Sequence, residues 1–464
     1  MAERSYDLVV LGSGPGGYTA AIRAAQLGMR VGIIERERLG GICLNWGCIP
    51  TKALLKNAEL IAAFRNGSEW GISADGMKVD FKRVIERSRA AADRLSKGVD
   101  FLMKKNKIAV HYGYGRLTGS GRLEVKAKDT IENLQASHIL IATGARPRQL
   151  PGVAIDRQRV ISSTEAMTLS TLPQSLIIIG AGAIGIEFAY FYHTLGTKVT
   201  VVEMMPGILP IEDRELTKEL ERIFRKRGMA ILTGTKVQKV KPGEKGVAVT
   251  VETTDGSKEL TADLALVAIG VQGNIENVGL EELGMKVDRD RITVDVDYRT
   301  NVSGVYAIGD VIGPPWLAHV ASAEGIHCVE AIAGKHPEPI DYTSIPGCTY
   351  CQPQVASIGL TEEKARELGK DVKIGKFPLR ALGKAIAIGE IDGMVKLIFD
   401  AKYGELLGGH ILGAEATEMI MELMIAKRHE ATAESILHGV HAHPTMSEAI
   451  MEASAAALGQ AINI

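Results

Sequence analysis

Residues 8–35, LVVLGSGPGGYTAAIRAAQLGMRVGIIE, indicate the fold of the first part of the chain. An apolar strand leads into a G-x-G-x-x-G turn at Gly12, Gly14 and Gly17, and a helix and a second apolar strand follow. The first glycine permits the tight turn, the second lets backbone N–H groups approach a diphosphate, and the third lets the helix pack closely on the strand. Because the diphosphate rests at the positive end of the helix, the pattern predicts a dinucleotide-binding α/β unit.

A second copy of this pattern, LIIIGAGAIGIEFAYFYHTLGTKVTVVE, occupies residues 176–203 and aligns with the first without a gap. Each copy ends in an acid, Glu35 or Glu203, where a carboxylate can accept hydrogen bonds from a ribose diol. One such pattern is a weak indication, whereas two complete copies predict that the chain binds two dinucleotides. The glycines of the second copy are Gly180, Gly182 and Gly185.

The acid of the second copy also indicates which nicotinamide is used. A carboxylate at Glu203 would repel a 2′-phosphate, and the next residues, Met204 and Met205, offer no arginine to receive one. The sequence therefore favours NAD over NADP.

Size and composition exclude several classes of protein. At 464 residues the chain is long enough for about three or four structural units. Its net charge of −1 provides no broad basic field for nucleic acid or an anionic membrane surface. No run approaches about 18 uninterrupted apolar residues, so no membrane span is expected. The first residues lack the features of a secretion or transit signal, and we expect a cytoplasmic protein.

Further strands followed by glycine occur along the chain. Residues 139–148 and 264–274 each read as a strand that returns beneath a nucleotide site. In VYAIGD, residues 305–310, Asp310 ends a strand and suits the binding of sugar or ribityl hydroxyls. The character of the sequence changes at residues 344–369, where a last α+β stretch begins.

Two of the five cysteines, Cys43 and Cys48, lie in GGICLNWGCIP, residues 40–50. A zinc site is disfavoured because the next histidine downstream is His111, so we predict no metal. Inert packing and a disulfide both stay open. Five residues of regular helix rise about 7.5 Å, whereas the Cα atoms of a disulfide lie about 4.4–6.8 Å apart. A bond here requires a distorted helix start, which the neighbouring glycines permit, and strain makes a disulfide easier to reduce. The neighbours are Gly40, Gly41, Gly47 and Pro50.

The segment GGICLNWGCIPTKALL, residues 40–55, resembles the redox-disulfide motif of the class I pyridine nucleotide-disulfide oxidoreductases. The resemblance covers essentially the whole chain and is greatest to the members that oxidise dihydrolipoamide. It implies FAD in the first glycine site and NAD in the second. It also implies that Cys43 exchanges with a dithiol substrate and that Cys48 contacts the flavin as a charge-transfer thiolate. Trp46 departs from the motif, which usually has a small aliphatic residue there.

The resemblance implies further cofactor-binding residues. Lys52 matches a lysine beside the flavin ring, and Glu187 matches its carboxylate partner. Other positions carried over as cofactor-binding are Gly115, Thr143, Gly144, Asp310, Ala318, Val237 and Gly270.

The fold class implied is α/β, with two doubly wound (Rossmann-like) dinucleotide-binding domains and a C-terminal α+β dimerisation domain. We expect residues 1–148 to form the first part of the FAD-binding domain and 149–275 the NAD-binding domain. Residues 276–343 are expected to complete the FAD domain, and 344–464 to form the dimerisation, or interface, domain.

A candidate base lies near the C-terminus in HGVHAHPTMSEAIMEA, residues 438–453. Dithiols are poorly nucleophilic at neutral pH until a base removes a proton, and a histidine oriented by an acid can serve. His443 and Glu448 resemble the family's His-x-x-x-x-Glu dyad. The resemblance implies that this histidine serves the other subunit of a homodimer and that the His443–Pro444 bond is cis. His441 is interpreted as structural.

Other motifs have simpler interpretations. CTYC, residues 348–351, raises the alternatives of a second redox centre or half of a zinc site, but it lies in a predicted strand and no second pair follows. Cys328 is interpreted as a packing residue. The methionine-rich helix predicted over residues 415–430 is interpreted as core or as dimer surface.

The implied reaction converts a dihydrolipoamide-type dithiol and NAD⁺ into a disulfide, NADH and a proton. The implied partners are a second copy of the chain, lipoyl domains, and the E2-type core of 2-oxo acid dehydrogenase complexes or the glycine cleavage H protein. Three alternatives stay open. The first is a glutathione-type reductase, but those enzymes use NADPH through basic residues that are absent after Glu203. The second is a mercuric reductase, but those enzymes carry a C-terminal cysteine pair that ALGQAINI lacks. The third is a non-catalytic flavoprotein.

Overall fold

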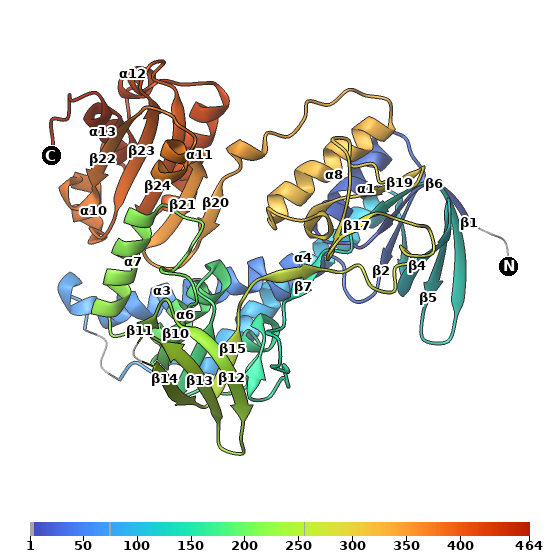
Figure 1. The fold of residues 1–464 in the computed structure, drawn as a ribbon, viewed down its shortest axis with the longest axis horizontal. Coiled ribbons are helices and arrows are strands. Elements are labelled where there is room, and N and C mark those ends of the chain that lie inside the picture. The colour runs from blue at the N-terminus through green and yellow to red at the C-terminus, as the bar shows by residue number, and fades with distance from the viewer. Residues whose placement is uncertain (1–3, 74–75, 255) are drawn as a thin grey trace. The chain divides into compact units, whose positions relative to one another are not determined.

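The computed structural model describes residues 4–73, 76–254 and 256–464 (Figure 1). The chain divides into two compact units, and each is described separately. Unit 1 comprises the chain up to Leu54 together with Lys82–Arg148 and Gly270–Ile340. Unit 2 comprises Leu55–Phe81, Gln149–Ile269 and Asp341–Ile464.

The main sheet of unit 1 has the strand order β3-β2-β1-β6-β5-β4, with β19 paired to β6. Strands β3, β2, β1, β6 and β19 are parallel, and β4 and β5 continue the sheet in antiparallel fashion. The strands are β1 (Arg4–Leu11), β2 (Val31–Glu35), β3 (Ala109–Tyr112), β4 (Tyr114–Gly119), β5 (Arg122–Lys126), β6 (Ile131–Ile141) and β19 (Val305–Ala307). Two small antiparallel pairs are β7 (Ala145–Pro147) with β16 (Val271–Gly273), and β17 (Val287–Asp288) with β18 (Arg291–Ile292).

The parallel strands of unit 1 are buried on both faces. Leu8 and Val10 of β1 join one core cluster, and Val9 and Leu11 join another, because successive side chains of a strand point to opposite faces. Helices α1 (Pro15–Gln26) and α8 (Ala318–Ile332) lie side by side in Figure 1. They approach so closely that a Cβ on Gly16 would lie 2.8 Å from the carbonyl oxygen of Ala321. Unit 1 also contains α2 (Gly41–Trp46), the start of α3 (Cys48–Arg65), η2 (Gly309–Ile312) and nearly all of α4 (Phe81–Lys105).

The first sheet of unit 2 repeats this arrangement. Its strands are all parallel, in the order β11-β10-β9-β15-β8, and a three-stranded antiparallel sheet, β12-β13-β14, accompanies it. The strands are β8 (Val160–Ile161), β9 (Ser175–Ile179), β10 (Lys198–Val202), β11 (Ala230–Leu232), β12 (Lys236–Pro242), β13 (Val247–Thr253), β14 (Gly256–Ala262) and β15 (Leu264–Val267). The helices of this part are η1 (Gly67–Trp70), α5 (Ser163–Ala166), α6 (Ala183–Leu195) and α7 (Arg214–Lys226).

The C-terminal part of unit 2 is an antiparallel sheet in the order β20-β21-β24-β23-β22. Helix α13 packs so closely on β22 that a Cβ on Gly375 would overlap the carbonyl oxygen of Ala453. The strands are β20 (Gly347–Thr349), β21 (Gln354–Gly359), β22 (Val372–Pro378), β23 (Met394–Asp400) and β24 (Leu406–Gly413). The helices are η3 (Tyr342–Ser344), α9 (Glu362–Glu367), η4 (Leu379–Ala381), α10 (Gly383–Ile388), α11 (Ala416–Arg428), α12 (Ala433–Leu437) and α13 (Glu448–Ala457).

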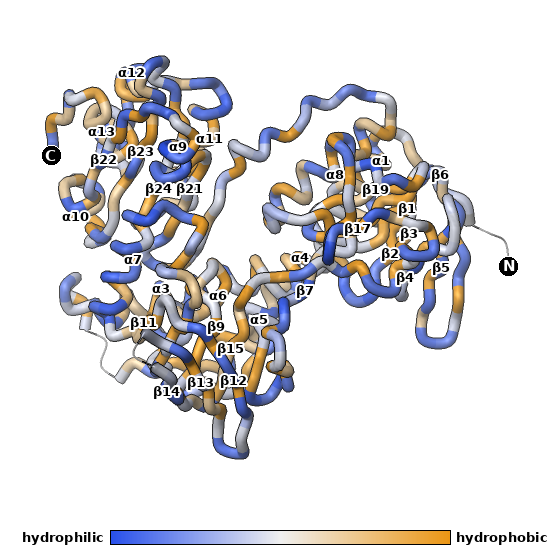
Figure 2. The backbone as a smooth tube through the Cα atoms, viewed as in Figure 1, coloured by the Kyte–Doolittle hydropathy of each residue, from blue (hydrophilic) through white to orange (hydrophobic). Residues whose placement is uncertain are grey.

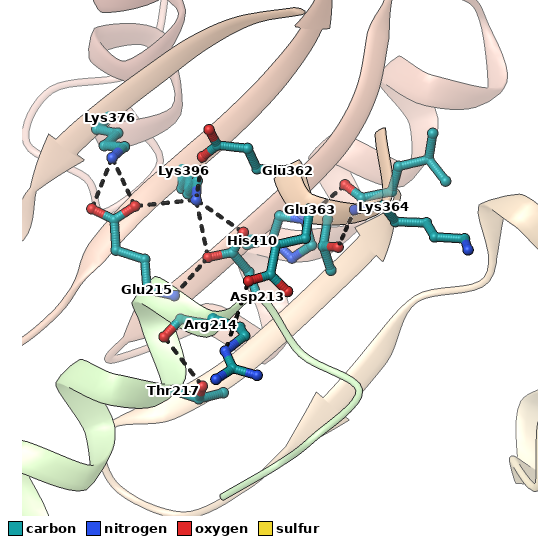
Figure 3. A network of polar contacts seen from close by, with 12 residues as sticks. Asp213, Arg214, Glu215, Thr217, Glu362, Glu363, Lys364, Lys376, Lys396 and His410 are labelled. Carbon is teal, nitrogen blue, oxygen red and sulfur yellow. Dashed lines mark hydrogen bonds and ion pairs between the residues drawn. The ribbon is translucent and has the colours of Figure 1, made fainter. Parts of the chain in front are cut away.

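A buried ionic network connects α7 to the C-terminal sheet (Figure 3). Lys396 of β23 points its ammonium toward three carboxylates, at 2.9 Å from Asp213, 2.9 Å from Glu362 and 3.1 Å from Glu215. The side chains of Lys396 and Asp213 are each only 3% exposed. Asp213 also caps α7 by accepting the backbone N–H of Glu215 at 3.0 Å. Because an unpaired buried charge is costly, these partners depend on one another.

Figure 2 shows apolar residues concentrated along the central strands of each unit and polar residues on the connecting loops. Within the part of the chain that the structure describes, no helix has both the length and the apolar character needed to cross a bilayer. The pairing of β19 with β6 means that a late segment of the chain joins the first sheet. The four domain ranges given above stay predictions.

Candidate active site

The first glycine turn has the geometry that its spacing predicts. Gly12 has φ +107°, and a Cβ there would overlap the carbonyl oxygen of Ala142. A Cβ on Gly17 would overlap the carbonyl oxygen of Gly12, whereas nothing lies within 4 Å of a Cβ on Gly14. The turn is therefore tight at its first and third glycines and open at the second. Helix α1 begins directly after Gly14 with no side-chain cap, so its first N–H groups fit a diphosphate.

The acid at the end of β2 lies beside this turn. Glu35 is buried, and its Oε2 accepts hydrogen bonds from the backbone N–H of Ser13, at 3.2 Å, and from the Ser13 hydroxyl. Its Oε1 accepts the N–H of Glu37 at 2.8 Å. These bonds orient the carboxylate and leave acceptor capacity for ribose hydroxyls. Ser13 was not among the predicted residues, although its place between two glycines of the turn was a signal that could have found it.

Asp310 provides a second test of whether unit 1 fits a flavin dinucleotide. It lies in η2 just after β19, and desolvation by burial raises the pKa of its carboxyl to about 6. Among the described residues the Asp310 carboxylate has no hydrogen-bond partner. A partly buried acceptor without a protein donor fits the hydroxyls of a bound ribityl chain.

The second glycine turn, in unit 2, reproduces the first. Gly180 has φ +104°, a Cβ on Gly185 would overlap the carbonyl oxygen of Gly180, and the position of Gly182 is open. Glu203 accepts the N–H of Ala181 at 2.6 Å and the N–H of Met205 at 2.8 Å. This carboxylate is therefore oriented as Glu35 is, and the exposed thioethers that follow it carry no charge for a 2′-phosphate.

The two cysteines of the motif lie on different helices. Helix α2 ends at Trp46, Gly47 is non-helical with φ −150° and ψ −114°, and α3 begins at Cys48. The predicted break in the helix is thus present. Both cysteines are free thiols, and the hydrogen bond between them raises the pKa of Cys43, with burial raising it further and the charge of Lys52 lowering it. The two thiols are therefore within hydrogen-bonding distance of each other.

Helix α2 places this pair directly on the dinucleotide turn. Gly41, at the start of α2, has φ +59°, and a Cβ there would lie 2.6 Å from the Cα of Gly14. Only glycine allows that approach. The cysteine motif and the first glycine turn are therefore one local site, as the resemblance implies for a flavin beside a sulfur pair.

The predicted base and its acid are paired in unit 2. His443 Nδ1 lies 2.9 Å from Glu448 Oε1, and Glu448 Oε2 accepts the N–H of Thr445 at 2.8 Å. Desolvation opposes ionisation of Glu448, but the hydrogen bonds from His443 and Thr445 outweigh it and lower the pKa of the carboxyl. The His443 side chain is 77% exposed. The His443–Pro444 bond is cis, which confirms that expectation.

The lysine and the carboxylate predicted to flank the flavin each lie on a helix. Lys52 is on α3, one turn after Cys48. Glu187 is buried on α6, and its Oε1 accepts the N–H of Tyr350 at 2.9 Å. Their pairing stays a prediction.

The other predicted cofactor positions lie at strand ends, turns and strand interiors. Thr143 and Gly144 follow β6, and the Thr143 hydroxyl donates to Asn274 O at 2.8 Å. Gly144 and Gly270 both have positive φ and open space at the Cβ position. Ala318 is the first residue of α8, Gly115 lies on β4, where a Cβ would overlap the Leu11 side chain, and Val237 lies on β12.

The CTYC motif and the other residues given simpler interpretations lie in the following surroundings. Cys348 lies on β20, but the strand ends at Thr349, so the expectation that the motif lies in a strand was wrong for its second half. Cys351 is buried and donates to Pro353 O at 3.2 Å, which closes a turn instead of continuing the strand. The remaining residues have the packing roles expected: Cys328 is fully buried, His441 bonds to Glu422 at 2.8 Å, and α11 buries Met419 while exposing Met421.

Comparison with known proteins identifies the class. The model of the pyridine nucleotide-disulphide oxidoreductase family matches residues 6–325, and that of the family's dimerisation domain matches residues 345–454. The chain therefore belongs to the pyridine nucleotide-disulphide oxidoreductases, a family of flavoprotein enzymes. The predicted fold class, the resemblance, and FAD and NAD as cofactors are confirmed. The dimerisation-domain match supports a homodimer.

Particular relatives narrow the class. The chain is 52% identical to dihydrolipoyl dehydrogenase of Rhizobium etli, with 100% of each chain covered. It is 45% identical to dihydrolipoyl dehydrogenase of Bacillus subtilis, with 99% of each chain covered. Among solved structures, LpdA of Mycobacterium tuberculosis is similar with a TM-score of 0.90 and 28% identity, over 97% of this chain and 99% of that one.

Proposed function

We propose that this chain oxidises protein-bound dihydrolipoamide to lipoamide and passes the electrons to NAD⁺. The observation that carries the proposal is the hydrogen-bonded pair of thiols, Cys43 and Cys48, held on the dinucleotide turn by the approach of Gly41 to Gly14. Relatives covering the whole chain bear the name dihydrolipoyl dehydrogenase.

The sulfur chemistry is a two-step exchange. In the disulfide form of the pair, a substrate thiolate attacks Cys43 Sγ, the Cys43–Cys48 bond breaks, and Cys48 leaves as a thiolate. The second substrate sulfur then attacks the first, forming lipoamide and releasing Cys43. The substrate loses two electrons and two protons, and the cysteine pair gains the two electrons.

His443 is the proposed base for the substrate thiol. With Nδ1 bonded to Glu448, its Nε2 has no hydrogen-bond partner among the described residues and can take the proton. Because Glu448 has a lowered pKa, it stays ionised and stabilises the imidazolium that forms. Glu448 is thus a positioning residue for His443.

The two glycine turns are the proposed cofactor sites. The N-terminus of α1, Glu35 and Asp310 would hold FAD, and the N-terminus of α6 with Glu203 would hold NAD. When bound, FAD supplies the transfer of the electron pair between the dithiol and the nicotinamide. Lys52 and Glu187 are proposed to lie beside it. The further residues in the proposal are Gly115, Thr143, Gly144, Ala318, Val237 and Gly270.

The proposed partners follow from the substrate. A second copy of the chain would present its His443 to the cysteines of the first, and lipoyl domains would bring the dithiol from an E2-type core or from the glycine cleavage H protein. A cytoplasmic location belongs to the same proposal, because five cysteines in 464 residues do not make the disulfide scaffold of a secreted protein.

A spectroscopic titration tests this function. Purified protein should be yellow or become so with FAD, should bleach on addition of NADH, and should recover its colour with lipoamide. A protein that stays colourless after reconstitution contradicts the proposal, as does one whose colour responds to NADH but never to lipoamide.

A further inference from the structure

Helix α2, which holds Cys43, is attached at both of its ends. At its start, the N–H of Gly40 donates to the carbonyl oxygen of Ser13 at 3.0 Å and lies 3.2 Å from the Ser13 hydroxyl. Ser13 also donates to Glu35, so the start of the helix is fastened to the dinucleotide turn.

Two side chains from other segments, Glu37 and Arg89, hold the end of α2. The indole Nε1–H of Trp46 donates to Glu37 Oε1 at 3.1 Å. The guanidinium of Arg89, on α4, lies 4.5 Å from the centre of the Trp46 ring and donates to the carbonyl oxygen of Asn45. A helix leaves its last carbonyls without internal partners, and Arg89 satisfies one of them while stacking on the indole.

We name this arrangement the Trp46 clamp (Glu37, Trp46 and Arg89). Its Trp46 and Arg89 are half-buried, its Glu37 is exposed, and it is continuous with the cofactor site. Burial lowers the pKa of Arg89, with Asp93 opposing that shift, and desolvation strengthens a cation–π contact. The N–H of Glu37 donates to Glu35 Oε1, so the carboxylate that holds the indole follows the one that faces the ribose site.

We propose that Trp46 and Arg89 are positioning residues that hold Cys43 within reach of Cys48. The inference rests on the proposed role of these cysteines as a redox pair. The two thiols are on separate helices joined only at the non-helical Gly47, so the backbone alone does not fix their separation. The closer and better aligned the two thiols are held, the higher is the effective concentration of one near the other. A higher effective concentration shifts the equilibrium from the dithiol toward the disulfide.

Loosening the clamp should therefore shift the pair toward the dithiol. Trp46→Phe keeps a ring beneath Arg89 but removes the N–H that reaches Glu37. Arg89→Lys keeps the charge but loses the planar donor that bonds and stacks at once. The matched controls are Trp70→Phe and Arg87→Lys, at exposed positions outside the clamp.

The experiment equilibrates each holoenzyme with graded mixtures of dihydrolipoamide and lipoamide, quenches in acid, alkylates free thiols and counts modified Cys43 and Cys48 by mass spectrometry. We expect the equilibrium ratio of dithiol to disulfide to be about three- to tenfold higher in each clamp variant than in the wild type. A tenfold change corresponds to about 30 mV in the reduction potential of a two-electron couple. The controls should match the wild type. Both substitutions act on the same end of α2. The fold-change in the dithiol-to-disulfide ratio of the double variant should therefore be smaller than the product of the fold-changes of the two single variants.

Clamp variants that fold, retain FAD and equilibrate like the wild type would overturn the inference. If Trp46→Phe does not fold, Arg89→Lys decides the question alone. A wild-type pair that never exchanges with either form of the substrate overturns the proposed function itself, a result separate from any difference between variants.

Discussion

His443 Nδ1 lies 2.9 Å from Glu448 Oε1, and this bond directs the other ring nitrogen of His443 outward. The acid is mostly buried and the histidine mostly exposed, with 17% and 77% of their side chains accessible. The pair therefore has the form of a base presented by an anchored carboxylate. Its consequence for activity can be measured.

Replacing His443 with Gln should reduce dihydrolipoamide oxidation by about two to four orders of magnitude, the usual scale for loss of a general base. Transfer of electrons from NADH to ferricyanide needs no thiol proton and should fall far less. Steady-state rates in both assays measure the two effects. Equal losses in both would mean that the substitution damages folding or the dimer.

Replacing Cys48 with Ser should abolish the long-wavelength absorbance band expected on two-electron reduction, because the resemblance assigns that band to the Cys48 thiolate. Cys348→Ser is the matched control, since this cysteine lies on β20 and has no proposed redox role. Anaerobic titration with NADH followed by visible spectroscopy provides the measurement. A band that persists in Cys48→Ser would show that the thiolate is wrongly assigned.

NADH should be preferred over NADPH by at least about a hundredfold, which corresponds to a clash of a few kcal/mol between the Glu203 carboxylate and a 2′-phosphate. Glu203→Gln should narrow the preference because it removes the charge. Glu259→Gln, at an exposed position of β14, should leave it unchanged. The measurement is the ratio of the kcat/KM values for NADH and NADPH. Comparable values in the wild type would contradict the assignment of NAD as the nicotinamide cofactor.

The buried network around Lys396 predicts acid sensitivity. Desolvation would raise the pKa of Asp213, but Lys396 outweighs it and lowers that pKa, and its hydrogen bond also lowers the pKa of Glu362. A carboxyl whose folded pKa is lowered stabilises the fold above its unfolded pKa, about 4, and loses that contribution as the pH falls through the folded value. Urea unfolding should therefore show stability that is constant above about pH 5 and declines below about pH 4.

Lys396→Met should reduce the free energy of unfolding at pH 7 by about 3–5 kcal/mol, because it leaves buried carboxylates without their cation. Acidification should protonate these carboxylates and relieve the repulsion between them. The difference in the free energy of unfolding between the variant and the wild type should therefore become smaller toward low pH. Lys373→Met, at an exposed position of β22, is the matched control and should unfold like the wild type. A deficit that does not depend on pH would indicate lost packing instead of lost charge pairing.

Features contained within one short segment could be predicted from the sequence. The tight and open positions of the glycine turns depend on residues a few positions apart, and Gly12 and Gly180 have the backbone that the spacing requires. The break between Cys43 and Cys48 followed from the distance that regular helix would impose. The His443–Glu448 bond spans only five residues and a helix start.

Features that join distant segments could not be predicted in this way. No local pattern indicates that Arg89 stacks on Trp46, because the contact depends on where α4 packs beside α2. Asp213 and Lys396 likewise meet only because α7 packs against the C-terminal sheet. The CTYC interpretation failed in part for a different, local reason, since Cys351 bonds to Pro353 O only two residues away and closes a turn that β propensity does not describe.

Backbone sterics and short spacings thus made the doubly wound folds and the two dinucleotide turns with their acids predictable from the chain, whereas the proposed redox and proton-transfer residues came from the family resemblance. By contrast, the packing of distant segments brings the cysteine helix onto Gly14 at Gly41, places a clamp at its far end and buries Lys396 among three acids. Those relationships arise when elements distant in sequence pack together, and the chemistry of each side chain then depends on neighbours that its own segment does not contain.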